Sequence, residues 1–269
     1  MGLIAPGQAE LHRWRPSVPS GHPRHPLRSP GAAAVWNGVV WGRLGRGDHA
    51  WAWWDSVADE TLQPWIAAER GRVLRELGLH AVAQELEEHG LSQARDLVDA
   101  VMLRLALAAD AVGLGEESVA RRALGTASSL LDELPEDDRV RRQRLRRSWV
   151  EVEVSMLAGS QPSDEDLPWL EPDGPAFPDD YEAGTDFHRA KGLLFGGVVR
   201  KDTELLVAAS QLAPPALRWA IELARLDGGD ADAGSRAAGA WQQLVPPAEF
   251  EDAAAATPTA KRLRSLGRR

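Results

Sequence analysis

The sequence predicts an all-α protein made of stacked pairs of antiparallel helices. Apolar residues recur at helical spacing from residue 55 onward, and glycines or prolines end each periodic stretch. A hydrophobic content of 43% over 269 residues is enough for a buried core. The first 54 residues are rich in Pro, Gly, Arg and His without a helical period, so we expect most of them to be irregular. Within them, Asn37-Gly38 predicts a type I′ turn and therefore a short β-hairpin.

Residues 55–159 are expected to form the first block of helices. Asp55 or Ser56 can cap the first helix, which ends at Gly78 because glycine readily adopts the left-handed conformation that closes a helix. A second helix follows and ends at Gly90. Each of these helices carries its apolar residues on one face, so each needs a neighbour to cover that face.

The clearest pair of helices lies in residues 101–135. A Gly113-Leu-Gly115 break separates two periodic stretches, and Pro135 ends the second one. Two antiparallel helices approach closely only where small side chains face each other. The tetratricopeptide pattern of about 34 residues has large and small residues at such positions. Here they are Leu107 and Ala108 in the first helix, and Ala120, Leu124 and Ala127 in the second. We therefore expect a tetratricopeptide-like solenoid, because a single pair would be marginal alone.

The remaining segments complete the predicted organisation. A third helix ends the first block, and residues 160–182 then hold five prolines and eight acidic residues with no basic one, which is typical of an acidic loop or linker. Residues 183–247 return to helical spacing and form a second block. Residues 1–54 are a basic segment rich in Pro, Gly and Trp, and residues 248–269 an Ala-rich and basic tail.

Three helix motifs in the second block repeat a known pattern. The matching residues are Arg189, Lys191, Gly192 and Leu194, then Ala208 and Ala209, then Leu217, Arg218, Ala220, Leu223, Ala224, Arg225 and Leu226. They resemble the C-terminal tetratricopeptide region of large ATP-binding bacterial transcription regulators of the STAND class. More faintly, residues 62–78 are similar to the helix that opens the bacterial transcriptional activation domain. The resemblance implies the partner-reading or sensing part of such a regulator.

The chain lacks the parts of those regulators that carry chemistry. No phosphate loop ending in Gly-Lys-Ser/Thr occurs, and the Gly-rich stretch 42–47 has no lysine. Residues 1–54 hold no long amphipathic helix for a DNA-binding helix-turn-helix. Neither G-x-S-x-G nor H-E-x-x-H is present, and there is no cysteine. We therefore expect no enzyme activity, no cofactor and no catalytic or metal site.

Charge is distributed unevenly along the chain. The net charge is −9, but both ends are basic and the middle is strongly acidic. Such a body repels nucleic acid, while either end could contact phosphate. No run of 18 or more apolar residues occurs, and the Pro-rich start lacks the apolar core of a signal peptide. We expect a cytoplasmic protein with no membrane contact.

Two basic segments are candidate contacts for a partner or for nucleic acid. The first is Arg139, Arg142 and Arg146, within a run of six arginines between residues 139 and 147, and the second is Lys261, Arg262 and Arg264 in the tail. The other interpretation of the first segment, which we favour, is a solvated outer helix face. His12, His22 and His25 could bind a metal ion, but a fourth ligand is missing and a solvated segment is favoured.

Five of the eleven tryptophans lie between residues 36 and 54. Each can bury about 150–250 Å², whereas a protein surface rarely exposes a contiguous apolar patch above a few hundred Å². A cap over the open end of the first helical block is therefore favoured over a stacking platform for a ligand. The residues expected to pack there are Trp51, Trp53 and Trp54, close to Trp65.

Together these patterns predict a non-catalytic module that binds another protein or senses a ligand, in a setting of transcriptional regulation. The alternative is a nucleic-acid-binding regulator that uses the basic N-terminal segment, the arginine run of residues 139–147 and the C-terminal tail. A third hypothesis is a degenerate fragment of a larger regulator. The oligomeric state is left open by the sequence.

Overall fold

The computed structural model describes residues 3–7, 29–162 and 185–267. Within these ranges the chain forms thirteen α-helices and no β-strand, so the predicted all-α class is confirmed. The only β pairing among them is an isolated bridge between Arg46 and Val245. Nearly all of the predicted acidic linker lies outside the described residues, as do His12, His22 and His25.

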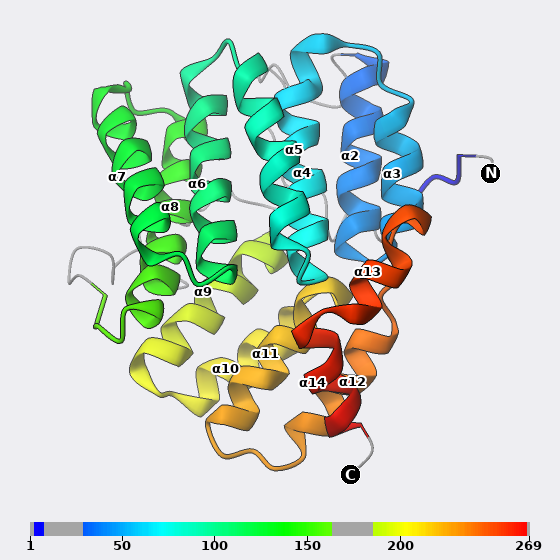
Figure 1. The fold of residues 1–269 in the computed structure, drawn as a ribbon, viewed down its shortest axis with the longest axis vertical. Helices are drawn as coiled ribbons and strands as arrows, with labels where there is room; N and C mark the ends of the chain where they lie inside the picture. The colour runs from blue at the N-terminus through cyan, green and yellow to red at the C-terminus, as the bar shows by residue number, and fades with distance from the viewer. Residues whose placement is uncertain (1–2, 8–28, 163–184, 268–269) are drawn as a thin grey trace.

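The helices up to α8 follow one another with short connections, as do those from α9 onward, and the step from α8 to α9 runs through residues outside the described ranges (Figure 1). They are α2 (Pro30–Arg43), α3 (Gly47–Asp55), α4 (Gln63–Glu76), α5 (His80–Gln93), α6 (Leu97–Gly113), α7 (Glu117–Glu133), α8 (Asp138–Leu157), α9 (Thr185–Arg200), α10 (Thr203–Leu212), α11 (Pro215–Asp227), α12 (Ala233–Gln242), α13 (Glu251–Ala256) and α14 (Pro258–Leu266). Two short 3₁₀ helices, Glu60–Leu62 and Ala248–Phe250, precede α4 and α13.

The N-terminal segment differs from the expectation of irregular chain with a β-hairpin. Residues 30–43 and 47–55 are helical, and the hairpin prediction at Asn37-Gly38 is wrong. The helix α2 begins at Ser29, whose hydroxyl accepts a hydrogen bond from the Ala32 backbone N–H at 3.0 Å. Gly38 has a packing role instead of a turn role. A Cβ atom there would lie only 2.3 Å from Nε1 of Trp54, so glycine allows α3 to approach α2.

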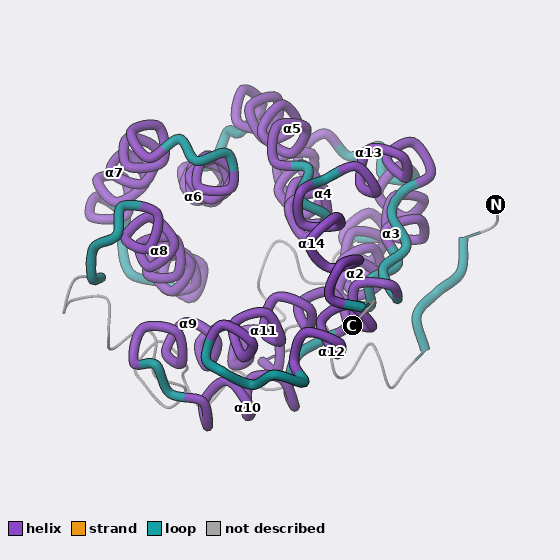
Figure 2. Tube along the Cα trace, turned by 60° about the horizontal axis from the view of Figure 1, so that its bottom comes forward, coloured by secondary structure: helices purple, strands orange, loops and turns teal. Residues whose placement is uncertain are grey.

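The helices are arranged as a closed ring of pairs (Figure 2). Five pairs of consecutive helices pack together: α2 with α3, α4 with α5, α6 with α7, α9 with α10, and α11 with α12. The single helix α8 packs on both α6 and α7 and contacts α9. The inner circle consists of α2, α4, α6, α8, α9 and α11, because each of these contacts the next and α11 returns to α2.

Small residues set the spacing between paired helices, as the sequence pattern predicts. Ala108, Ala120 and Ala127 are fully buried, and Leu124 packs with them in one apolar cluster of α6, α7 and α8. Gly90 does not end its helix, since α5 continues to Gln93. A Cβ atom at Gly90 would lie 2.5 Å from the Ala67 methyl group, so this glycine also permits close approach of two helices.

The ring closes where the turn between α2 and α3 meets the segment after α12. The Gly47 N–H donates to the Val245 carbonyl at 2.8 Å, and the Val245 N–H donates to the Gly45 carbonyl at 2.7 Å. Trp51 adds a hydrogen bond from Nε1 to the Glu249 carboxylate at 3.0 Å. Residues 248–267, which were expected to be a tail, form helices, and α14 packs on α12.

The tryptophans lie at this junction. Trp54 and Trp65 are buried, and Trp36 contacts Trp65 edge-to-face with ring centroids 4.9 Å apart. Trp51 is also buried, whereas Trp53 is half-buried and donates from Nε1 to the Ile4 carbonyl at 2.8 Å. They fill the core between α2, α3 and α4, close to the predicted position. However, they cover no open end, because α2 also contacts α11.

Candidate functional site

A pocket of about 140 Å³ lies inside the ring. Five of the inner helices line it, namely α2, α4, α6, α8 and α9. Helix α6 supplies an apolar wall that includes Met102 and Leu105. The other helices supply two carboxylates, Glu69 and Glu153, against a larger set of cations. Those seven cations are Arg43, Arg72, Arg75, Arg139, Arg142, Arg146 and Lys191. We call this cavity the central pocket.

Helix α8 carries a polar stripe into the central pocket. Arg139, Arg142, Gln143, Arg146 and Glu153 recur at three- and four-residue steps, so they share one face of the helix. The apolar residues of α8 pack against α6, α7 and α9, which leaves this second face directed at the interior. The expectation that Arg139, Arg142 and Arg146 lie on a solvated outer face is therefore wrong. Their side of α8 is turned toward the pocket, with other helices across it.

Arg72, Arg75 and Arg139 are among the lining cations that pair with carboxylates. Arg72 contacts Glu69 and Glu76, each at 2.8 Å. Although burial disfavours its charged form, these carboxylates raise the pKa of Arg72 above the ordinary value. Arg139 contacts Asp96 at 2.7 Å and Asp99 at 3.5 Å. Most of these partners do not line the cavity, so the negative charge lies behind the positive wall.

Arg75 is held by a buried carboxyl pair between α4, α5 and α6. Its Nη1 lies 2.6 Å from Oδ2 of Asp110, and its Nη2 lies 3.1 Å from Oε1 of Glu87. Burial raises the pKa of Glu87 well above its usual value, and the neighbouring Asp110 raises it further against the opposing effect of Arg75. His80 contacts Asp110 at 3.2 Å on the other side. This cluster fixes the Arg75 guanidinium at the pocket wall.

Arg146 and Lys191 have no such partners. No hydrogen bond or ion pair of 4 Å or less joins either side chain to another residue in the described part of the chain. Burial lowers the pKa of Lys191 to about 8, against an opposing effect of Glu153 and with Arg75 and Arg146 lowering it further. Burial likewise lowers the pKa of Arg146. Both groups therefore carry their charge at a free-energy cost.

Three cationic side chains lie close to the aromatic ring of Phe187, near the start of α9. The guanidinium carbon of Arg43 lies 4.5 Å from the ring centroid, that of Arg72 lies 5.9 Å from it, and Nζ of Lys191 lies 5.6 Å from it. Cation–π contacts offset part of the cost of burial. They do not neutralise charge, and burial together with neighbouring guanidinium groups lowers the pKa of Arg43 to about 9.

Buried polar atoms of the lining that have no hydrogen-bond partner among the described residues include Nη2 of Arg72, Oε1 of Gln143 and Nε1 of Trp149. Each of these side chains is at most 9% exposed. Buried polar groups in proteins nearly always have partners, so unsatisfied ones around a cavity indicate a place for a polar ligand or water.

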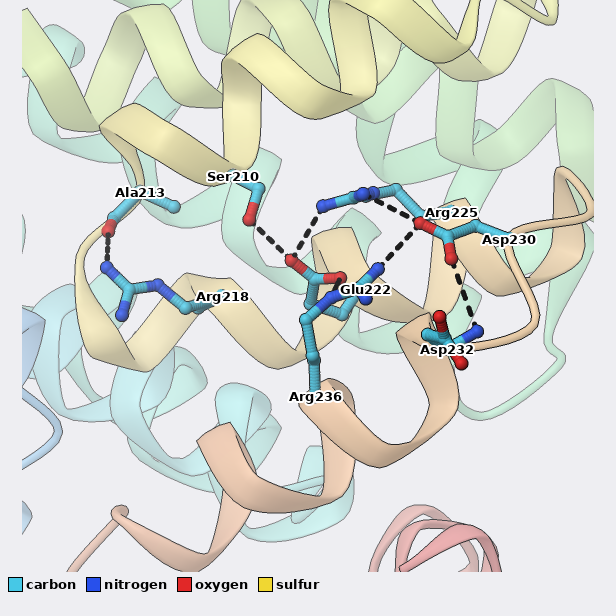
Figure 3. A network of polar contacts seen from close by, with 8 residues as sticks. All are labelled: Ser210, Ala213, Arg218, Glu222, Arg225, Asp230, Asp232 and Arg236. Atoms are coloured by element: carbon cyan, nitrogen blue, oxygen red, sulfur yellow. Dashed lines mark hydrogen bonds and ion pairs between the residues drawn. The ribbon is translucent and has the colours of Figure 1, made fainter.

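A second cluster of arginines, on α10, α11 and α12, has a different character (Figure 3). Glu222 is buried at its centre and accepts hydrogen bonds from Arg225 at 3.2 Å and Arg236 at 2.9 Å. Both arginines also contact Asp230, at 2.7 Å and 2.6 Å, and Ser210 donates to Glu222. Here each arginine has two carboxylate partners. We call this the Glu222 network.

The candidate contacts of the C-terminal segment lie apart from the central pocket. Lys261, Arg262 and Arg264 are exposed on α14. Arg262 pairs with Asp227 at 3.0 Å, and Arg264 donates to the Ala255 carbonyl at 2.6 Å. They do not line the cavity that holds Arg139, Arg142 and Arg146, so the two sets form no common surface there.

The sequence analysis did not identify Arg43, Arg72, Arg75, Glu153 and Lys191 as site residues. A signal for Arg43 is present, since it ends a helix that is otherwise almost wholly apolar. Lys191 lies within a motif that was assigned to packing. The remaining three, Arg72, Arg75 and Glu153, lie on α4 and α8, and the sequence pattern does not show that these helices border one cavity with α6 between them.

We compared the chain with protein-family models, with curated proteins and with solved structures, and none of them matched. Among the described helices, none is both long and apolar enough to cross a membrane. The functional argument therefore depends on the central pocket itself.

Proposed function

We propose that this chain is a non-catalytic sensor module that binds a small anion in its central pocket. The observation that carries the proposal is the excess of cations on the pocket wall, where seven cationic side chains face two carboxylates. Arg146 and Lys191 are the strongest support, because a bound anion would give them a counter-charge in direct contact, whereas the described carboxylates act on them only from beyond 4 Å.

The apolar wall and the size of the cavity support a small ligand. A cavity of about 140 Å³ is close in volume to one of about 150 Å³ that accommodates benzene. Such a space excludes a nucleic-acid duplex or a peptide helix. Arg139, Arg142 and Arg146 face this cavity, and for that reason we favour a small anion over nucleic acid as their partner.

Two parts of the proposal rest on the sequence resemblance. The tetratricopeptide-like character of the helical pairs supports a protein partner on the outer helices, because stacked pairs present broad surfaces. The similarity of the second block to transcription regulators supports a role in transcriptional regulation. Among the described residues, the alternative of a nucleic-acid-binding regulator retains the exposed cations of α14, and the basic residues 8–28 lie outside the described ranges.

Thermal unfolding with and without small anions tests the proposal. Inorganic phosphate, sulfate and succinate are added separately at constant ionic strength. A ligand at a hundredfold excess over its dissociation constant stabilises by about 2.7 kcal/mol, which corresponds to a rise of about 5–10 °C in the unfolding midpoint. We expect such a rise with at least one of the three anions.

The double variant Arg146→Gln/Lys191→Gln is expected to lose this rise. Arg189→Gln is the matched control, since Arg189 is exposed on α9 only two residues from Lys191 and does not line the central pocket. If none of the anions raises the midpoint, or if the double variant responds as well as the control, the proposed function is wrong.

A further inference from the structure

The unsatisfied polar atoms of the central pocket differ in kind, and this restricts the ligand. Nη2 of Arg72 and Nε1 of Trp149 are donors, whereas Oε1 of Gln143 is an acceptor. A ligand that satisfies all of them must bring acceptor oxygens and at least one hydrogen-bond donor. A fully deprotonated anion with oxygen acceptors alone would leave Gln143 unsatisfied.

The cations approach the cavity from several helices. Arg72 comes from α4, Arg146 from α8 and Lys191 from α9. Arg43 of α2 lies over the aromatic ring of Phe187, as Arg72 does. A planar carboxylate is best bound by one guanidinium in a bidentate pair within a single plane. Donors from separate directions instead suit the oxygens of a tetrahedral group.

We infer that the central pocket binds a phosphate group, with Arg72, Arg146 and Lys191 on its oxygens and Gln143 accepting a hydrogen bond from its hydroxyl group or from a hydroxyl of a short attached fragment. This inference rests on the proposed function, since it names the anion that the sensor takes. Hydrogen phosphate is a tetrahedral dianion that carries one hydroxyl donor. Sulfate has the same shape and charge at neutral pH but no proton.

The comparison of phosphate with sulfate is therefore the informative measurement. An unsatisfied buried acceptor costs about 1–3 kcal/mol, so we expect inorganic phosphate to bind the full chain at least tenfold more tightly than sulfate in isothermal titration calorimetry at pH 8. Succinate tests a dianion without tetrahedral geometry. Glycerol 3-phosphate distinguishes a phosphomonoester ligand from free phosphate, and the tighter of the two identifies the source.

Gln143→Leu tests whether Gln143 accepts a hydrogen bond from the hydroxyl group of the ligand. We expect phosphate to bind at least tenfold more weakly to this variant and sulfate to bind as it does to the wild type, so that the preference disappears. Gln143→Ala is a second variant in case leucine disturbs α8, and the far-ultraviolet circular dichroism of each variant confirms its helices. An unchanged preference in both variants would rule out the role of Gln143.

The possible failures are distinguishable. If sulfate or succinate binds as tightly as both phosphate compounds, the phosphate inference is wrong but the proposed function survives. If no anion binds, both are wrong. If either phosphate compound is preferred and the preference depends on Gln143, the inference is supported.

Discussion

The central pocket and the Glu222 network both contain clustered cationic side chains, but they differ in whether carboxylates pair with those cations. Both gather arginines at the junction of three or more helices. In the Glu222 network, Arg225 and Arg236 each contact two carboxylates, and the centre is complete without any ligand. In the central pocket, Arg146 and Lys191 have no hydrogen bond and no ion pair of 4 Å or less to a described residue, and burial lowers the pKa of both.

This difference distinguishes cations that hold helices together through paired carboxylates from cations for which we propose an anionic ligand. Buried charges with matched partners fix the geometry of neighbouring elements, and their removal destabilises the fold. Buried charges without partners reduce stability, and proteins retain such groups where function needs them. Opposite signs of the effect on stability are therefore expected when each cluster is neutralised.

Replacing the centre of the Glu222 network should have the largest effect. Glu222→Ala removes the common acceptor of Arg225, Arg236 and Ser210. Because both arginines keep Asp230 and some contact with solvent, we expect a loss of about 2–3 kcal/mol in the free energy of unfolding. Urea denaturation measures it. Glu204→Ala is the control, since Glu204 is exposed on α10, and equal stability of the two variants would contradict a structural role for the network.

Neutralising the unpartnered lysine should have the opposite sign. Lys191→Met removes the charge of a half-buried side chain and keeps the aliphatic stem, so we expect the protein without added anion to gain about 1 kcal/mol. The unfolding midpoint should then rise by about 2–4 °C. Arg189→Met on the same helix should leave it unchanged. A Lys191→Met protein that is less stable than the wild type would mean that Lys191 is structural.

The gain from Lys191→Met should depend on pH. The pKa of Lys191 is about 8 in the folded protein and 10.5 in an unperturbed lysine, so the unfolded state binds more protons between these values. Wild-type stability contributed by this group therefore rises with pH across that window. Arg43 titrates nearby, so the quantity to follow is the difference between wild type and variant. We expect it to shrink from about 1 kcal/mol at pH 7 as the pH approaches 10. A difference that stays constant would show that Lys191 is not desolvated.

The smallest effect is expected on α14. Arg262 pairs with Asp227 at 3.0 Å, but both side chains are more than half exposed. Exposed ion pairs contribute about 0–1 kcal/mol, so Arg262→Gln should change stability by less than about 0.5 kcal/mol and leave anion binding unaltered. Loss of phosphate binding in this variant would place the anion site on the outside of the molecule.

Local features of the fold were predictable from the sequence, whereas its closure was not. Gly113 ends α6, Gly78 follows α4 with a positive φ of 77°, and the small residues of α6 and α7 that were expected to face each other are buried in one cluster. These features depend on neighbours within a few turns of helix. The bridge from Gly45 and Gly47 to Val245 joins residues about two hundred positions apart, and no periodicity reports such a contact.

The site was harder to predict for the same reason. A run of arginines has the same composition on an outer face and on the wall of a cavity. Only the surrounding helices distinguish the two cases, because α4 and α9 place Arg72 and Lys191 around the same cavity as Arg146. The misread Asn37-Gly38 pair shows the converse, because a strong local turn signal was overridden by the packing of Trp54 against α2.

The junction at Gly45, Gly47 and Val245 fixes the circumference of the molecule. An open array of helical pairs can change its curvature. A closed ring of pairs cannot, because the number of helices in the circle sets its inner radius. The central pocket should therefore keep its diameter whether it is empty or filled. Inserting one more helical pair would enlarge it, so the number of pairs, and not the choice of side chains alone, limits the size of molecule that this ring can admit.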